Sequence, residues 1–131
     1  MPKYARFNAW LIENGVRHPS VDYPVAFGKH GQLIGMAASK DVPPLKAFLS
    51  VPCRLIITEQ TVMKSNVAHI ILKHPEIFKS HHDSEYLTLG LFIMHEILKG
   101  EDSFWYPYLE IINFSDLPML WTKHEIEELQ D

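Results

Sequence analysis

The segment 83–99, DSEYLTLGLFIMHEILK, constrains the fold of this chain more than any other stretch. Asp83 or Ser84 can cap a helix here, and Gly100 can end it. Its apolar residues surround most of the helical circumference, which is typical of a helix that packs on several sides. Four of them share one face: Leu87, Leu91, Met94 and Leu98. We therefore expect a central, nearly enclosed helix.

Further helices are predicted on both sides of this segment. YARFNAWLIENG, near the start, has apolar residues at helical spacing and stops at Gly15. Thr58 can cap a helix that begins at Glu59. Residues 65–79 read as one helix broken by Pro75. Near the end, the pair Thr122 and Glu125 matches the capping box of a final acidic helix.

Three short runs favour β-strands, at 32–38, 47–52 and 54–58. The first two are joined by SKDVPPLK, whose two prolines exclude a helix interior. The stretch VRHPSVDYP at 16–24 reads as turn-rich. The sequence thus predicts one α+β domain over residues 1–131, with a few short antiparallel strands and about five helices.

Composition excludes several classes of protein. The 131 residues carry a net charge of −4, and their basic residues form no stripe, so nucleic-acid binding is not expected. The longest apolar run, 89–94, is too short to span a bilayer, so no membrane insertion is expected. The single cysteine permits no internal disulfide, and the N-terminus lacks the features of a signal peptide. We expect a soluble intracellular protein, its compartment left open.

The eight histidines do not follow the spacing of metal ligands. The run HHD at 81–83 places adjacent side chains in different directions, and His69 and His74 are five residues apart rather than three or four. His95 and Glu96 resemble part of a zinc-protease motif, but Lys99 stands where the second histidine is required. No metal ligand is predicted.

No catalytic group emerges from the remaining residues. Cys53 lies between Pro52 and Arg54, where a lone cysteine is most often a small buried residue. The aromatic segment SFWYPYL at 103–109 is typical of core and rim, with Pro107 in the first turn of a helix through YLEII. A peptide-binding platform of Trp105, Tyr106 and Tyr108 stays open as an alternative.

Five motifs occur in a specific order, from FNAWLIENG through IGMAASKDV, LSVPCRLIITEQTVMKS and SFWYPYL to LWTKHEIEEL. This series resembles the N-terminal part of SET-domain protein methyltransferases of the Rubisco large-subunit and actin-histidine methyltransferase type. The resemblance implies a truncated SET-like domain. It also implies that S-adenosylmethionine would contact the backbone at Gln32, Leu33, Ile34 and Gly35, with Leu33 replacing the first glycine of the family's Gly-x-Gly strand.

The resemblance places the family's other functional residues in polypeptide that follows this part. Its Asn-His pair has no counterpart here, since Asn8, Asn14, Asn66 and Asn113 are followed by Ala, Gly, Val and Phe. The family's channel-lining tyrosine and its substrate lobe also belong to that later part. We therefore assign no catalytic, cofactor-binding or metal residue in this sequence, and we expect no cofactor.

Two functions follow from the resemblance. The first is a non-catalytic half-SET protein that acts as a structural or interaction subunit of a larger protein assembly. The second is a fragment or split part of an S-adenosylmethionine-dependent protein lysine or histidine methyltransferase. Both imply protein partners, because strand edges and an apolar helix that pair with the missing part would otherwise be uncovered.

Overall fold

The computed structural model of the protein describes residues 2–31, 33–79, 84–113 and 117–128, and it combines helices with one small sheet. The helices are α1 (Pro2–Glu13), α2 (Glu59–Met63), α3 (Ala68–Lys73), α4 (Pro75–Phe78), α5 (Ser84–Lys99), α6 (Tyr106–Leu109) and α7 (Lys123–Glu127). The strands are β1 (Val21–Phe27) and β2 (Leu33–Ala38), and there are 3₁₀ turns at Cys53–Leu55, Gly100–Asp102 and Pro118–Leu120. The predicted α+β class is confirmed.

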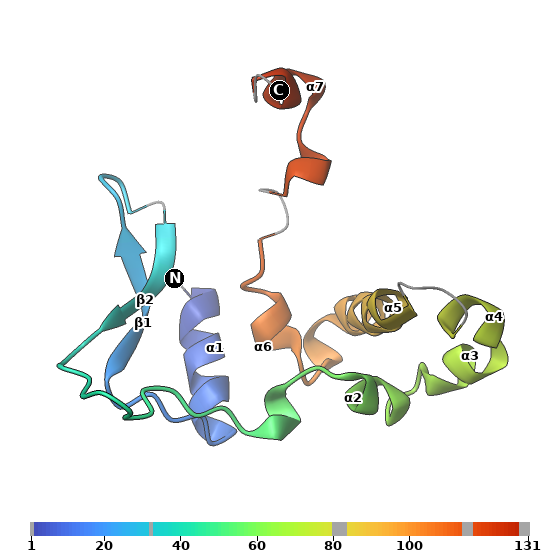
Figure 1. Ribbon diagram of the computed structural model, residues 1–131, viewed down its shortest axis with the longest axis horizontal. Coiled ribbons are helices and arrows are strands. Elements are labelled where there is room, and N and C mark those ends of the chain that lie inside the picture. The colour runs from blue at the N-terminus through green and yellow to red at the C-terminus, as the bar shows by residue number, and fades with distance from the viewer. Residues whose placement is uncertain (1, 32, 80–83, 114–116, 129–131) are drawn as a thin grey trace.

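The elements form two groups on either side of α6 (Figure 1). The hairpin of β1 and β2 lies against α1 in one group, and α5 lies with α2, α3 and α4 in the other. α6 contacts both α1 and α5 and so joins the groups. α7, at the red end of the chain, lies apart from both (Figure 1).

The hairpin is antiparallel, and its register runs from Val21 opposite Ala38 to Phe27 opposite Leu33. β2 confirms the strand predicted at 32–38, although Gln32 lies outside the described residues. β1 was not predicted, because its proline and its flanking residues read as turns. The strand tolerates Pro24 because the register is irregular between Asp22 and Val25, so no ladder hydrogen bond from Pro24 is needed there.

The predictions of strands at 47–52 and 54–58 are wrong, because the structure forms neither strand. The first has only an isolated antiparallel bridge, between Arg17 and Ser50. The second begins as the 3₁₀ turn Cys53–Leu55, in which the Leu55 N–H donates to the Pro52 carbonyl over 2.9 Å. Strand-forming side chains do not make a strand without a neighbouring strand, and the described part of the chain offers these residues none.

The helix boundaries follow the local signals in the sequence. Gly15 adopts φ +82° and donates its N–H to the Ile12 carbonyl over 3.0 Å, which ends α1 as predicted. The Thr58 hydroxyl accepts from the Thr61 N–H and caps α2. Pro75 separates α3 from α4. α6 has Pro107 in its first turn as predicted, but it ends at Leu109 instead of continuing through YLEII.

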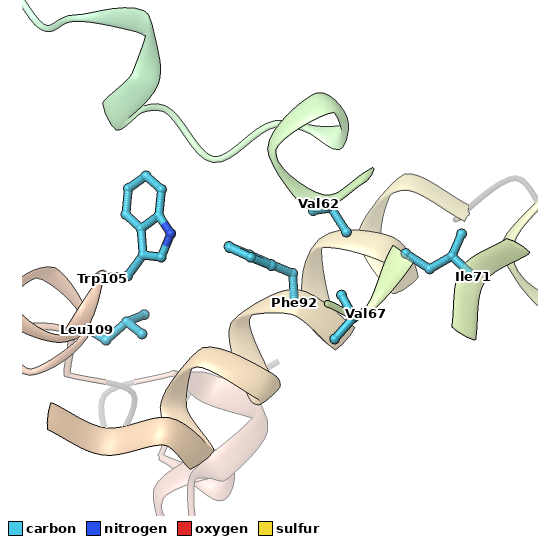
Figure 2. Close-up of a cluster of buried hydrophobic side chains, with 6 residues drawn as sticks. All are labelled: Val62, Val67, Ile71, Phe92, Trp105 and Leu109. Atoms are coloured by element: carbon cyan, nitrogen blue, oxygen red, sulfur yellow. The ribbon is translucent and has the colours of Figure 1, made fainter. Parts of the chain in front are cut away.

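The hydrophobic core belongs to the helical group. Figure 2 shows its six buried side chains, which α2, α3, α5 and the region of α6 contribute: Val62, Val67, Ile71, Phe92, Trp105 and Leu109. Phe92 of α5 is 2% exposed, and its ring meets that of Trp105 edge-on at 6.4 Å. These contacts fix the position of the aromatic segment relative to α5.

α5 is a helix as predicted, but the prediction that it is nearly enclosed is wrong. Its buried residues are Thr88, Phe92 and Glu96, which lie on one face. On the opposite side Met94 is 64% exposed and Leu98 is 85% exposed. Among the helices that the structure describes, neighbours cover only one side of α5, and the other apolar side faces outward.

Candidate functional site

The hairpin carries the residues that the resemblance places against S-adenosylmethionine. Gln32 is outside the described residues, and Leu33 begins β2 with 63% of its surface exposed. Leu33 lies opposite Phe27 in the register, so both side chains project from the same face of the hairpin. This face is therefore apolar and exposed.

Gly35 lies on the same face, and its own geometry depends on Phe27. A Cβ at Gly35 would lie 3.1 Å from Cε2 of Phe27, which is closer than ordinary packing allows. The ring thus covers the side of Gly35 that a side chain would occupy, a common arrangement for glycine in a strand. Phe27 is therefore the side chain that lies beside Gly35 on this face.

The aromatic segment is a structural junction rather than a shared platform. Trp105 is 6% exposed and packs against Trp10 of α1 at 6.0 Å and Phe104 at 5.2 Å between ring centroids. Phe7 of α1 lies 6.2 Å from Tyr108. Of the residues considered for peptide binding, Trp105 is part of the core and Tyr108 lies at its rim. The interpretation as core and rim describes this segment.

Arg6 connects α1 to α6 through two contacts. Its guanidinium carbon lies 5.3 Å from the Tyr106 ring centroid, and its Nη1 lies 3.3 Å from Oε2 of Glu110. Such cation–π and ion-pair contacts contribute modestly where they are partly exposed. These residues were not identified from the sequence, and no local pattern there would have indicated this contact between segments a hundred residues apart.

A buried carboxylate fixes the start of the aromatic segment. Glu96 is 4% exposed, and its two oxygens accept from the Lys99 ammonium and the Ser103 hydroxyl, each over 2.6 Å. The Ser103 oxygen in turn accepts from the Trp105 N–H over 3.0 Å. This chain of hydrogen bonds runs from α5 to the core tryptophan. The signal that could have predicted it is a glutamate on an apolar helix with a lysine three residues later.

Two opposing causes set the pKa of Glu96. Desolvation by burial is the largest single effect and raises the pKa. The hydrogen bonds from Lys99 and Ser103, with the nearby positive charge of Lys99, together outweigh it and leave the pKa below its ordinary value. Glu96 is therefore an ionised structural group at neutral pH, not an acid held ready for proton transfer.

Two apolar pockets lie beside α1. One, of about 180 Å³, is enclosed by α1, the hairpin and the segment around Leu49 and Val51. The other, of about 390 Å³, lies between α1, residues 51–57 and the aromatic segment. Both linings include Phe7, Leu11 and Val51, and neither includes a Lys, Arg, Asp or Glu. They suit an uncharged, apolar occupant rather than a charged substrate.

The other candidate residues do not gather into a site. The motif HHD at 81–83 lies outside the described residues. His69 Nδ1 bonds to the Asn66 carbonyl over 2.6 Å, and His74 Nδ1 bonds to Glu76 over 3.0 Å. Cys53 is exposed, so its interpretation as a small buried residue is wrong. No group of three or more potential metal ligands occurs among the described residues.

None of the helices in the described parts of the chain is long and apolar enough to cross a bilayer.

Two plant enzymes are among the known proteins with similar sequences. No protein-family model matches the chain. The ribulose-1,5-bisphosphate carboxylase/oxygenase large subunit N-methyltransferase, chloroplastic, of Pisum sativum is 28% identical over 130 residues, which cover 98% of this chain and 24% of that protein. The protein of the same description from Nicotiana tabacum is 26% identical over 127 residues, 95% of this chain and 23% of its own length. This chain spans about a quarter of the length of these relatives.

A solved structure agrees with the sequence comparison. It is described as Rubisco LSMT bound to sinefungin and monomethyllysine, and it aligns with a TM-score of 0.75 and 28% sequence identity. The alignment covers 98% of this chain and 28% of that one. In sequence and in fold, this chain is therefore similar over nearly its whole length to the N-terminal part of a SET-domain methyltransferase of the Rubisco large-subunit type.

Proposed function

We propose that this chain acts as a non-catalytic structural or interaction subunit, in an assembly with polypeptide that completes its SET-like fold. The observation that carries the proposal is the apolar surface that the described residues leave uncovered. On α5, Leu87, Met94, Ile97 and Leu98 are 43%, 64%, 47% and 85% exposed. Apolar surface of this kind on one helix side is typical of protein interfaces.

The hairpin supports the non-catalytic part of the proposal. Phe27 and Leu33 lie on the same face of the hairpin, and the ring of Phe27 covers Gly35 on that face. Glu96, a buried titratable group, is committed to hydrogen bonds with Lys99 and Ser103. Methyl transfer requires donor and acceptor to be aligned at close range with water excluded. The sequence has no counterpart of the Asn-His pair that the resemblance gives this role to.

The test is the behaviour of the full chain with and without its partners. By itself it should be oligomeric or poorly soluble in size-exclusion chromatography, and it should be stable and monodisperse in a complex isolated at its native level. A monodisperse monomer that unfolds cooperatively, with no associated protein, would contradict the proposal.

The comparisons favour a second candidate function. Both plant relatives are described as N-methyltransferases, and the similar structure is described as holding sinefungin and monomethyllysine. Under this alternative, the chain contributes its part of a SET-type enzyme that methylates a protein side chain with S-adenosylmethionine. The completing polypeptide then supplies the Asn-His and tyrosine motifs.

Isothermal titration with S-adenosylmethionine separates the two candidates. The native complex should show no saturable heat under the first proposal and a saturable one under the second. A complex that binds S-adenosylmethionine and methylates a lysine peptide would replace the first proposal by the second.

A further inference from the structure

We propose that a proline-rich turn of this chain docks into an aromatic pocket on a second copy of the same chain. The turn is formed by residues 42–46, and the aromatic pocket lies between α1 and residues 101–107. This contact goes beyond the proposed function, because neither the exposed side of α5 nor the strand edges of the hairpin take part in it.

Leu45 lies at the tip of the 42–46 turn in a conformation that is unfavourable for leucine. The Lys46 N–H donates to the Pro43 carbonyl over 3.2 Å, and Leu45 has φ +62°. Pro44 and the positive φ after it are features of a type II turn, whose third position normally holds glycine or asparagine. The Leu45 side chain is also fully exposed. A contact that buries this side chain offsets both the backbone conformation and the exposure.

The aromatic pocket has a lining that suits this turn. Its volume is about 530 Å³, and its aromatic walls are Trp10, Phe104 and Tyr106. The rings of Trp10 and Phe104 are tilted by 58° with their centroids 5.4 Å apart, and Phe104 is 50% exposed. Exposed aromatic faces of this kind bind proline-rich segments in other proteins. The prolines and the leucine of the 42–46 turn therefore match the pocket in chemistry.

The charges beside the two surfaces are complementary. Lys40 and Lys46 are exposed on either side of the turn, and Asp41 is the only carboxylate between them. Glu101, which lines the pocket, and its neighbour Asp102 are both exposed. A turn with more basic than acidic groups thus meets an acidic rim, an arrangement that favours one orientation of docking.

Arg6 is the basic residue of the pocket lining, and its charge is balanced within its own copy. Its Nη1 lies 3.3 Å from Oε2 of Glu110, and its guanidinium carbon lies 5.3 Å from the Tyr106 ring centroid. Arg6 therefore leaves the acidic rim of the pocket able to attract a lysine.

The positions of the turn and the pocket require a second molecule. The stretch that follows β2 lies at the outer side of the hairpin group, whereas α6 lies on the other side of α1 (Figure 1). One copy therefore does not place its own turn in its own pocket. Every copy carries both surfaces, so a second copy supplies the matching one. Because the two surfaces differ, the contact is heterologous.

Sedimentation equilibrium of the full chain tests the leucine. The background is Met94→Lys with Leu98→Lys, which removes the exposed apolar side of α5 from any self-association. On this background, Leu45→Ala should weaken self-association about tenfold or more, because it removes the apolar tip. Leu72→Ala on α3, where the side chain is 58% exposed, is the matched control and should stay within about twofold. Both side chains are exposed, so the melting temperatures should match that of the background chain.

Charge reversal tests the partners independently. Lys46→Glu and Glu101→Lys should each weaken self-association about threefold or more. An equimolar mixture of the two variants should associate as the background chain does, because each turn then finds a pocket of opposite charge. The chain that carries both substitutions should recover in the same way. A merely structural role for either residue would not give this recovery.

The outcomes separate this inference from the proposed function. Unchanged self-association in Leu45→Ala, or no recovery in the mixture of charge variants, overturns the inference. A background chain that stays monomeric at its highest soluble concentration also overturns it. In each case a complex of the wild-type chain with other polypeptide, isolated at native level, leaves the proposed function standing. Self-association that depends on Leu45 supports the inference even where no such complex is found.

Discussion

The helical group and the hairpin group of this protein differ in how far their apolar side chains are buried. In the helical group, Val62, Ile71 and Phe92 are 0%, 3% and 2% exposed, because short helices close in sequence pack around α5. In the hairpin group, Leu33 and Phe27 are 63% and 42% exposed, and every residue from Ala38 to Val51 is exposed. The first group builds a core from its own residues, whereas the second leaves apolar side chains and strand edges uncovered.

The difference follows from how helices and strands form their hydrogen bonds. A helix satisfies its backbone within one segment, so α2 to α6 need only side-chain contacts between neighbours. A strand needs another strand, and a two-stranded hairpin is marginal by itself in water. We therefore expect changes in the helical group to affect the stability of the whole chain, and changes in the hairpin group to act more locally.

The largest expected effect is that of Phe92→Ala. It removes the central ring of the cluster in Figure 2 and should lower the free energy of unfolding by about 3 to 5 kcal/mol. Urea unfolding of the full chain, followed by circular dichroism, measures it. The control is Leu98→Ala on the same helix, where the side chain is 85% exposed and the change should stay within about 0.5 kcal/mol. Equal effects would show that the two sides of α5 are equally buried.

Glu96→Gln should have the next largest effect, about 1 to 3 kcal/mol, because the Lys99 ammonium and the Ser103 hydroxyl lose a charged acceptor. The pKa of Glu96 is lowered in the folded chain, despite the opposing effect of desolvation. Its contribution is thus present above the pKa of the unfolded carboxyl and is lost as the pH falls through the folded-state pKa. Urea unfolding between pH 7 and pH 3 should show a loss in wild type that is smaller in the variant. Parallel pH curves would contradict this role.

In the helical group the helix boundaries were largely predictable from the sequence, whereas in the hairpin group α1 and β2 were predicted and β1 was not. Thr58, Pro75 and Gly100 act on their immediate neighbours, so helix starts, breaks and ends could be read directly. The side of α5 that is buried could not be read, because apolar residues surround the helix and only tertiary contacts select Phe92 over Met94. A strand forms only where a partner strand is present, and the local sequence does not show whether there is one. The prediction of a strand at 47–52 was wrong for this reason, since the structure gives that segment one bridge.

The candidate site shows the same limit on prediction. Leu33 was recognised as the residue in place of glycine, and the structure adds that Phe27 covers Gly35 beside it. That contact depends on the register of β1, a strand that the sequence did not indicate. The Ser103 bond to Glu96 joins residues seven apart across a turn, and no periodic pattern predicts it.

Two glycine substitutions should change stability in opposite directions. Gly35→Ala places a Cβ 3.1 Å from Phe27, and because that ring is partly exposed and can move, the loss should be about 1 kcal/mol or less. Gly90→Ala in α5 meets no atom within 4 Å, so it should raise the free energy of unfolding by about 0.5 to 1 kcal/mol through helix propensity. Chemical shifts should confine the Gly35→Ala change to the hairpin. A global loss larger than that of Glu96→Gln would mean that the hairpin is part of the same cooperative unit as the helices.

The smallest effect on the free energy of unfolding is expected at the cap of α7. Comparing it with the cap of α2 shows how far the effect of a cap depends on the packing of its helix. Thr58 and Thr122 form the same capping box, with partners at Thr61 and Glu125. Thr58→Ala should cost about 1 kcal/mol, because α2 carries the fully buried Val62 and cannot fray without opening the core. Thr122→Ala removes an equivalent bond from a helix with no buried residue, so the free energy of global unfolding should not change measurably. Urea unfolding gives the global value, and the amide shifts of α7 report the local loss of helix. A global loss at Thr122 equal to that at Thr58 would mean that α7 packs against the body of the protein, because only such packing can turn local fraying into global instability.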